Sequence, residues 1–200
     1  MNSVGISPRA GFDLACHPTT PLPAVRSLRV SPVLSADGVL RLDYHLAGDL
    51  PALRIPPAAA ARAADGLWRH TCFEAFLLPQ DGPGYVELNL SPSGEWAVYA
   101  FDAYRVRTDW QAEQGPAIEP SLAADALRLS ARVRPDALPP SCRVPRLRLA
   151  VAAVVEAASG ALSYWALRHP GAAPDFHHPA SFVLDLDRAG DARLTTGHSP

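Results

Sequence analysis

The sequence predicts an all-β protein, a single-domain antiparallel β-sandwich of the jelly-roll or immunoglobulin-like kind. Short segments alternate between apolar and polar residues, as half-buried strands do, and turns rich in Gly and Pro separate them. No stretch has the spacing of a convincing amphipathic helix. The 200 residues suit one domain and are enough to bury a single core.

The composition is that of an ordinary globular protein with a small negative charge. Hydrophobic residues make up 48% of the chain, charged residues 19%, and the net charge is -2. We expect no nucleic-acid partner, because phosphate binding needs a basic field. All 18 positively charged side chains are arginine. We attribute this excess to a GC-rich coding sequence and not to phosphate recognition.

The cysteines and the N-terminal residues predict a cytoplasmic protein. Cys16, Cys72 and Cys142 are odd in number and widely spaced, so they match neither a disulfide framework nor a zinc motif. The first residues lack the apolar core of a signal peptide, and no stretch approaches about 20 uninterrupted apolar residues. We therefore expect no membrane partner, while the oligomeric state stays open.

Residues 1–24 are rich in Pro, Gly and Thr and are expected to be irregular. The sandwich is expected over residues 25–187 and a loose tail over 188–200. The Ala-rich segment 56–66 is expected to be a loop with at most one helical turn, because so short an isolated helix is marginal in water. The expected strands are 25–34, 39–46, 53–55, 72–78, 85–91, 95–102, 127–134, 146–157, 162–168 and 181–186.

The stretch from residue 68 to residue 105 contains three of the expected strands and most of the candidate ligand-binding residues. Successive side chains alternate across a strand. In strands 72–78 and 85–91 one face is apolar, formed by Phe73, Ala75, Leu77, Val86, Leu88 and Leu90. If this face meets the core, then Glu74, Glu87 and Asn89 share the opposite face. Strand 95–102 is apolar on both faces, so we expect it to be central and covered on both sides.

Two kinds of side chain in this region are suited to a small ligand. Trp68 and Trp165 stand where their rings could stack on a flat ligand such as a sugar. Glu74 and Glu87 would have Cβ atoms about 4.5–5.5 Å apart if they faced each other on neighbouring strands. That spacing would suit a retaining glycosidase, but such carboxylates also fix sugar hydroxyls without catalysis, and Arg69 or Arg105 could neutralise one of them.

A histidine-rich segment near the end of the chain invites a metal-binding interpretation. His169, His177 and His178 lie close to Asp175. Adjacent residues of an extended segment point opposite ways, so His177 and His178 are not expected to chelate one ion together, and no HxH or HExxH spacing occurs. We expect a histidine that caps a pocket, with no metal site. Ser-His-Asp order, a GxSxG elbow, a P-loop and GxGxxG are also missing from the sequence.

Three segments, GLWRHTCFEAFL, YVELNLSPSGEWAVYAFDAYR and PDFHHPASFVLDL, resemble the DOMON-like group of bacterial proteins, which is similar to family-9 carbohydrate-binding modules. The resemblance covers residues 25–186. It implies a β-sandwich with one small-ligand site, for a sugar in the carbohydrate-binding relatives and for haem in some DOMON relatives. Trp68 and Glu74 match the positions that stack on the sugar and accept its hydroxyls. Phe176 and Trp165 are both candidates for the second aromatic ring.

These observations predict a non-catalytic protein that binds a soluble sugar or sugar-like metabolite, without a cofactor. Ligation of haem by Met and His is not expected, because the single methionine is Met1. The alternatives are a haem- or metal-binding DOMON-type module, a glycoside hydrolase that uses Glu74 and Glu87, and an interaction module without a small ligand. The expected ligand-binding residues are Trp68, Glu74, Glu87, Asn89, Arg105, Trp165, Phe176, His177 and His178.

Overall fold

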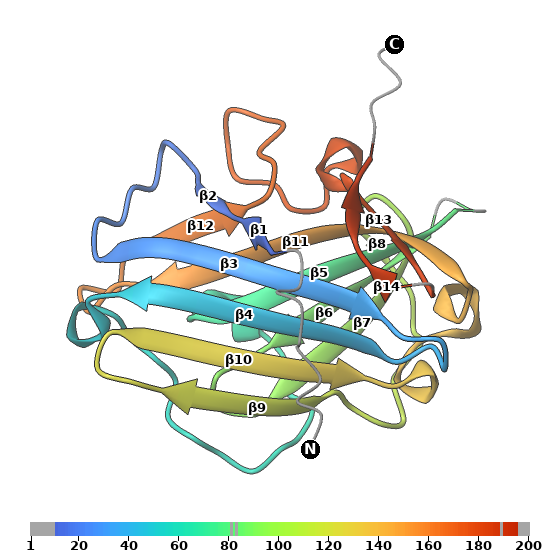
Figure 1. The fold of residues 1–200 in the computed structure, drawn as a ribbon, viewed down its shortest axis with the longest axis horizontal. Coiled ribbons are helices and arrows are strands. Elements are labelled where there is room, and N and C mark those ends of the chain that lie inside the picture. Colours follow the sequence, from blue (N-terminus) through green and yellow to red (C-terminus); the bar gives the residue numbers. More distant parts are fainter. Residues whose placement is uncertain (1–10, 81, 83, 189, 196–200) are drawn as a thin grey trace, which may run out of the picture.

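The computed structural model is a sandwich of two antiparallel sheets, here called sheet A and sheet B (Figure 1). It describes residues 11–80, 82, 84–188 and 190–195. The predicted all-β antiparallel fold is confirmed. In the described part of the chain, no helix has the length and apolar character needed to cross a membrane.

Sheet A has the strand order β1-β3-β4-β10-β9, and β14 also pairs with β3. Its long strands alternate between buried and less buried residues, which is why the sequence pattern could predict them. Gly38, with φ of 82°, lies in the tight turn that joins β3 to β4. The strands are β1 Phe12–Asp13, β3 Val25–Leu34, β4 Leu40–Gly48, β9 Ala117–Leu122, β10 Ala126–Val133 and β14 Gly190–Asp191.

Sheet B has the strand order β15-β13-β11-β5-β6-β7-β8, and β12 links β11 to β2. Its 11-residue strand β11 pairs with β5 on one side, and with β13 and then β12 on the other. The strands are β2 Ala15–Cys16, β5 Cys72–Pro79, β6 Tyr85–Leu90, β7 Trp96–Ala103, β8 Val106–Arg107, β11 Arg146–Glu156, β12 Leu162–Ala166, β13 Leu184–Asp187 and β15 Arg193–Leu194. Short 3₁₀ helices occur in the connections, namely η1 Leu50–Ala52, η2 Leu67–Arg69, η3 Pro135–Ala137, η4 Pro140–Cys142 and η5 Pro179–Ser181.

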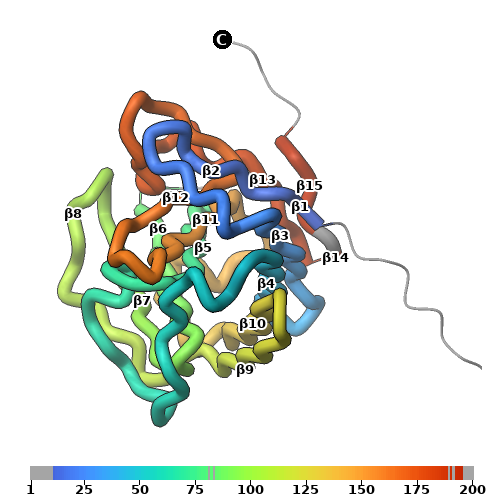
Figure 2. Tube along the Cα trace, turned by 90° about the vertical axis from the view of Figure 1, so that its left-hand side faces the viewer, coloured from blue at the N-terminus to red at the C-terminus, as the bar shows by residue number. Residues whose placement is uncertain are grey.

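The main core lies between the two sheets, which Figure 2 shows as separate layers, with β3, β4 and β10 in one and β5, β6 and β7 in the other. The predicted apolar face of β5 and β6 packs in this core. Tyr44 of sheet A donates a hydrogen bond from its hydroxyl to the backbone carbonyl of Glu74 in sheet B, at 2.7 Å. The ring of Tyr44 also packs on Phe73, with centroids 4.8 Å apart. These contacts fix the position of β5 against sheet A.

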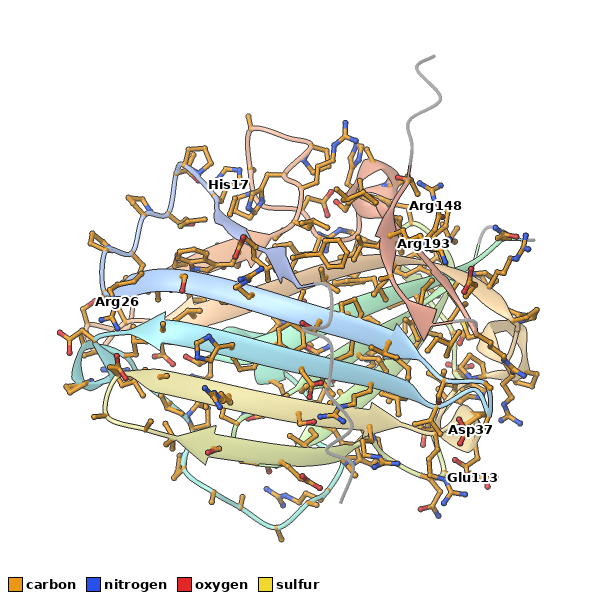
Figure 3. The ribbon with its side chains drawn as sticks, in the orientation of Figure 1. His17, Arg26, Asp37, Glu113, Arg148 and Arg193 are labelled. Atoms are coloured by element: carbon orange, nitrogen blue, oxygen red, sulfur yellow. The ribbon has the colours of Figure 1, made fainter. Side chains whose placement is uncertain are left out.

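Sheet B is also covered on its outer face, the face turned away from sheet A. A second apolar cluster there includes Phe76, Tyr85, Tyr99, Phe176 and Phe182. The segment that runs from β12 to β13 supplies part of this cover. Arg148 of β11 donates a hydrogen bond to the carbonyl of Phe182 in this segment; the labelled side chain in Figure 3 shows its position near η5. As a result, every residue of β6 is buried.

Several predicted boundaries differ from the structure. Residues 11–24 and 190–195, predicted to be irregular or loose, contribute β1, β2, β14 and β15. Those strands have two residues each, too few for an alternating pattern to reveal them. The same predictions for residues 1–10 and 196–200 lie outside the described residues.

The structure also tests three predictions for the interior of the chain. The predicted strand at 53–55 is wrong, since only Leu53 forms an isolated bridge, with Ala157. β7 is covered on both faces as predicted, but it lies next to the short edge strand β8 instead of at the centre. The loop predicted at 56–66 is confirmed.

The two-layer packing predicts the effect of a core truncation. Leu88 is fully buried on the core face of β6, so Leu88→Ala should lower the free energy of unfolding by about 2–5 kcal/mol in urea denaturation. Leu122, on edge strand β9, is 60% exposed, and Leu122→Ala should change it by about 0.5 kcal/mol or less. Equal effects of the two changes would contradict this packing.

Candidate ligand-binding site

A pocket of about 340 Å3 lies on the outer face of sheet B. Its size falls within the range of small-molecule sites, about 300–1,000 Å3. It combines aromatic rings with charged and polar groups. The lining residues are Trp68, Glu74, Glu87, Tyr99, Phe101, Arg105, Arg107, Val154, Tyr164, Pro174, Phe176 and His177.

Strands form the floor of the pocket, and loops form its walls. β5, β6, β7 and β11 each turn alternate side chains outward, away from the core. This parity puts Glu74, Glu87 and Tyr99 on the floor. The walls come from η2, from the segment after β7, from β12 and from the loop that follows β12.

The register of β5 and β6 sets the relation between the two carboxyl groups. Glu74 lies directly opposite Asn89, and Glu87 lies opposite Phe76. The two glutamates are therefore diagonal neighbours, and the directly facing arrangement considered from the sequence is not formed. The Asn89 side chain donates a hydrogen bond from Nδ2 to Oε1 of Glu87 at 2.6 Å. Asn89 thus lies beside Glu87, fully buried, and orients its carboxyl group.

Glu74 is buried without a partner for its side chain. It is 3% exposed, and its Oε1 atom has no hydrogen-bond partner among the residues that the structure describes. Burial raises the pKa of Glu74 well above its usual range, and the nearby charge of Glu87 raises it further. Burial also raises the pKa of Glu87, although the hydrogen bond from Asn89 acts in the opposite direction. The pocket floor therefore favours the protonated forms of these carboxyl groups.

His177 lies over the floor as a neutral side chain. Its Nδ1 atom is 2.8 Å from the hydroxyl of Tyr85, and its Nε2 atom is 3.6 Å from Oε2 of Glu87. Burial, with a contribution from the charge of Arg105, lowers the pKa of His177 to about 4. The Tyr85 hydroxyl accepts a hydrogen bond from the backbone N–H of Arg105 at 3.1 Å. In the tautomer in which Nδ1 accepts the Tyr85 proton, the neutral His177 ring carries its own proton on Nε2, on the side of Glu87.

Arg105 and Asp175 join two walls of the pocket. Arg105 Nη2 lies 2.9 Å from Oδ1 of Asp175, and the Tyr104 hydroxyl donates to Oδ2 of Asp175 at 2.7 Å. The backbone N–H of His177 donates to the same aspartate at 3.1 Å. Arg105 has a φ of 57°, a left-handed conformation that costs a non-glycine residue about 1–3 kcal/mol. The ion pair and hydrogen bonds hold this turn against the loop that carries Phe176.

Aromatic rings line the mouth of the pocket. Trp68 is 37% exposed and meets Tyr99 edge to face, with centroids 5.9 Å apart. The guanidinium of Arg107 stacks over the Tyr99 ring, with its central carbon 3.9 Å from the ring centroid. On the opposite wall Phe176 packs against Tyr164, with centroids 6.0 Å apart. Such rings offer apolar faces to a flat ligand.

The structure brings together six of the nine residues predicted to bind a ligand, namely Trp68, Glu74, Glu87, Arg105, Phe176 and His177. The other three lie elsewhere. Asn89 lies beside Glu87 but does not line the pocket, and Trp165 packs in the core between the sheets. His178 is exposed and accepts a hydrogen bond from the backbone N–H of Ala180 at the start of η5.

Other lining residues were not identified from the sequence. The pairing of Glu87 with Tyr99 explains the position of Tyr99 and, two residues on, of Phe101. A test of face parity across β6 and β7 could have found both. Arg107, Tyr164 and Pro174 come from segments without an alternating pattern, so only the three-dimensional structure places them.

The histidine-rich segment does not converge on one point. His169 Nε2 donates to the carbonyl of Ala15 at 2.8 Å, His177 contacts Tyr85, and His178 caps η5. Among residues 11–80, 82, 84–188 and 190–195, no group of three or more His, Cys, Asp or Glu side chains is placed to hold a metal ion.

Replacing Glu74 with Gln tests the effect of the buried carboxyl group on stability. A carboxyl whose pKa is higher in the folded chain gives its full stability below the unfolded pKa, and this stability is lost as the pH rises through the folded pKa. We therefore expect Glu74→Gln to raise the free energy of unfolding by about 1–3 kcal/mol at about pH 8, with little gain at about pH 4.

Urea denaturation at both pH values measures this difference. The exposed Glu119 of β9 supplies the control, and Glu119→Gln should change the free energy of unfolding by about 0.5 kcal/mol or less at either pH. A loss of stability in Glu74→Gln at the higher pH would show that the Glu74 carboxylate is well accommodated.

No protein-family model matches this chain, and no curated protein matches it either. One solved structure with a similar fold is a protein of Bacteroides uniformis described as a "putative carbohydrate-binding protein". The two share 17% sequence identity with a TM-score of 0.60, and the match covers 90% of this chain and 86% of that chain. At this identity the likeness shows a shared fold.

Proposed function

We propose that this protein binds a soluble sugar or a sugar-like metabolite in the pocket on the outer face of sheet B, without chemical turnover. The observation that carries the proposal is the combination of aromatic rings, one of them exposed, with a buried hydrogen-bonding atom that has no partner among the described residues. Trp68 and Phe176 line the walls, and the unpartnered Oε1 of Glu74 lies at the floor. A sugar offers both an apolar ring face and hydroxyl groups, so it complements both features.

Each polar group of the pocket has a role in this proposal. Glu74, whose pKa is raised by burial, can in its protonated form both donate to and accept from a hydroxyl group. Glu87, oriented by Asn89, accepts a second hydroxyl, and the Nε2–H of His177 adds a donor beside it. Trp68, 37% exposed, stacks on the sugar ring. The Arg105–Asp175 ion pair keeps the far wall in place.

Two similarities support this proposal. The resemblance of the sequence to the DOMON-like group and to family-9 carbohydrate-binding modules puts Trp68 and Glu74 at positions that contact sugar. The Bacteroides uniformis protein shares the fold, and its description names carbohydrate as its ligand class.

The glycoside-hydrolase alternative would use the same two carboxyl groups. Glycoside hydrolysis assigns one carboxyl as the acid and the other as an ionised nucleophile or base, and their pKa values must be split. Here burial raises the pKa of both Glu74 and Glu87, the charge of Glu87 raises that of Glu74 further, and the hydrogen bond from Asn89 opposes the rise at Glu87. A turnover assay therefore separates binding from hydrolysis.

Removing the exposed indole ring should weaken sugar binding. Isothermal titration with a panel of hexoses, hexosamines and N-acetylhexosamines is expected to find a binder, and Trp68→Ala should reduce its affinity at least tenfold, about 1.4 kcal/mol. Trp110 is half-buried and lies outside this pocket, so Trp110→Ala is the matched control. Thermal unfolding of both variants verifies that they fold. Unchanged affinity in Trp68→Ala would contradict the proposed stacking.

The same protein should not hydrolyse sugars. Incubation with aryl glycosides of the common hexoses is expected to release no aryl alcohol above the rate of a protein-free control. Release that is abolished by both Glu74→Gln and Glu87→Gln would instead assign a glycoside hydrolase to this pocket.

A further inference from the structure

The pocket floor contains two acidic groups without a paired cation. Glu74 and Glu87 are 3% and 6% exposed, and they lie close enough for the charge of one to affect the other. In the described part of the chain, no arginine forms an ion pair with either carboxyl group; Glu87 has a 3.6 Å contact with the neutral His177. A buried carboxylate without a partner is costly, because desolvation is not repaid.

The arginines of the pocket are committed to other carboxylates. Arg105 pairs with Asp175 at 2.9 Å, and Arg107 lies 3.8 Å from Asp65 while its guanidinium stacks on Tyr99. The charges of Arg105 and Arg107 still favour the ionised form of Glu87, but neither arginine forms an ion pair with it. Among the described residues, Oε1 of Glu74 has no hydrogen-bond partner at all.

The surroundings of the two glutamates also suit a cation. The rings of Trp68, Tyr164 and Phe176 line the space above the floor. The π face of an aromatic ring attracts a positive charge, and this attraction is stronger where water is displaced. A buried, unpartnered oxygen of Glu74 at the floor of this pocket offers a hydrogen-bond acceptor to an N–H donor.

We propose that the ligand is an amino sugar, and that its protonated amine binds between the carboxyl groups of Glu74 and Glu87. This inference rests on the proposed function and narrows its ligand class. An ammonium group has three N–H donors. One meets the unpartnered Oε1 of Glu74 and another meets Oε2 of Glu87, while the sugar ring stacks on Trp68. A neutral hydroxyl group can form one of these hydrogen bonds, but it cannot balance the charge.

Binding of the ammonium should release protons. The free pocket holds protons on its buried carboxyl groups, because burial raises their pKa values. An ammonium favours the ionised carboxylate, so the carboxyl proton leaves to solvent while the amine keeps its own. The affinity should therefore rise as the pH rises through the pKa values of the carboxyl groups, and it should fall once the ligand amine itself is deprotonated.

The other titratable groups near Glu74 and Glu87 do not reverse the expected rise of affinity with pH. His177, whose pKa is lowered to about 4, stays neutral over the range. Arg105 and Arg107 stay charged. The pKa of Tyr85 and that of Tyr99 are raised, so both stay protonated. Asp175, whose pKa is lowered, stays ionised. Asp65 accepts a hydrogen bond from the Tyr99 hydroxyl.

Isothermal titration with matched sugars tests the inference. The probes are D-glucosamine, D-galactosamine and D-mannosamine, each with its parent hexose and its N-acetyl derivative, near pH 6.5 in two buffers of different ionisation enthalpy. We expect at least one amino sugar to bind at least tenfold more tightly than both of its neutral counterparts. The buffer dependence of the heat should show protons released on binding.

Replacing Glu74 with Gln removes the negative charge of the carboxyl group while nearly keeping the size of the side chain. Glu74→Gln should reduce the preference for the amino sugar over its parent hexose at least fivefold and should diminish proton release. Glu119→Gln, on exposed strand β9, should retain both. Thermal unfolding verifies that each variant folds.

The possible results distinguish this inference from the proposed function. Equal or tighter binding of the parent hexoses or N-acetyl sugars, without proton release, would overturn the amine site and leave sugar binding in place. Absence of binding by every sugar of the panel would overturn the proposed function, and the inference with it. A preference for the amine that Glu74→Gln leaves unchanged would overturn the role of the carboxyl pair.

Discussion

Strands β5 and β6 bury both of their faces, and the position of the pocket follows from this constraint. On one face Phe73 and Leu88 pack in the core between the sheets, while on the other face Glu74 and Glu87 form the pocket floor. Because side chains alternate strictly along a strand, the core packing that fixes the register also fixes where both carboxyl groups point. The hydrogen bond from Tyr44 to the carbonyl of Glu74 adds a link between the sheets at this position.

Burial of the outer face gives the pocket its electrostatic character. The segment between β12 and β13 covers sheet B, and the Arg105–Asp175 pair fastens this segment to the turn after β7. Water is thereby kept from the floor, which raises the pKa of Glu74 and lowers that of His177. The wall arginines pair with Asp175 and Asp65, so they act on Glu87 only from a distance and form no ion pair with it. The fold thus leaves one buried floor atom, Oε1 of Glu74, that a ligand can satisfy.

The sequence predicted the long strands and the face of Glu74, Glu87 and Asn89, because both depend on local alternation. It could not predict pairing, which depends on register: Glu74 lies opposite Asn89 and not opposite Glu87. Trp165 was also predicted to contact the ligand, and its neighbour Tyr164 was not considered. In the structure the indole fills the core and Tyr164 lines the pocket, a difference of one residue in parity that a short strand does not reveal. Two-residue strands at both ends carried no periodic signal.

A crystal structure of the protein grown with the tightest-binding sugar of the panel tests the central claim most directly. The account predicts electron density for the sugar in the pocket on the outer face of sheet B, with its ring on Trp68 and a polar group within hydrogen-bond distance of Oε1 of Glu74. Sugar density on another surface, with the Glu74 carboxyl group still unpartnered, would contradict the account.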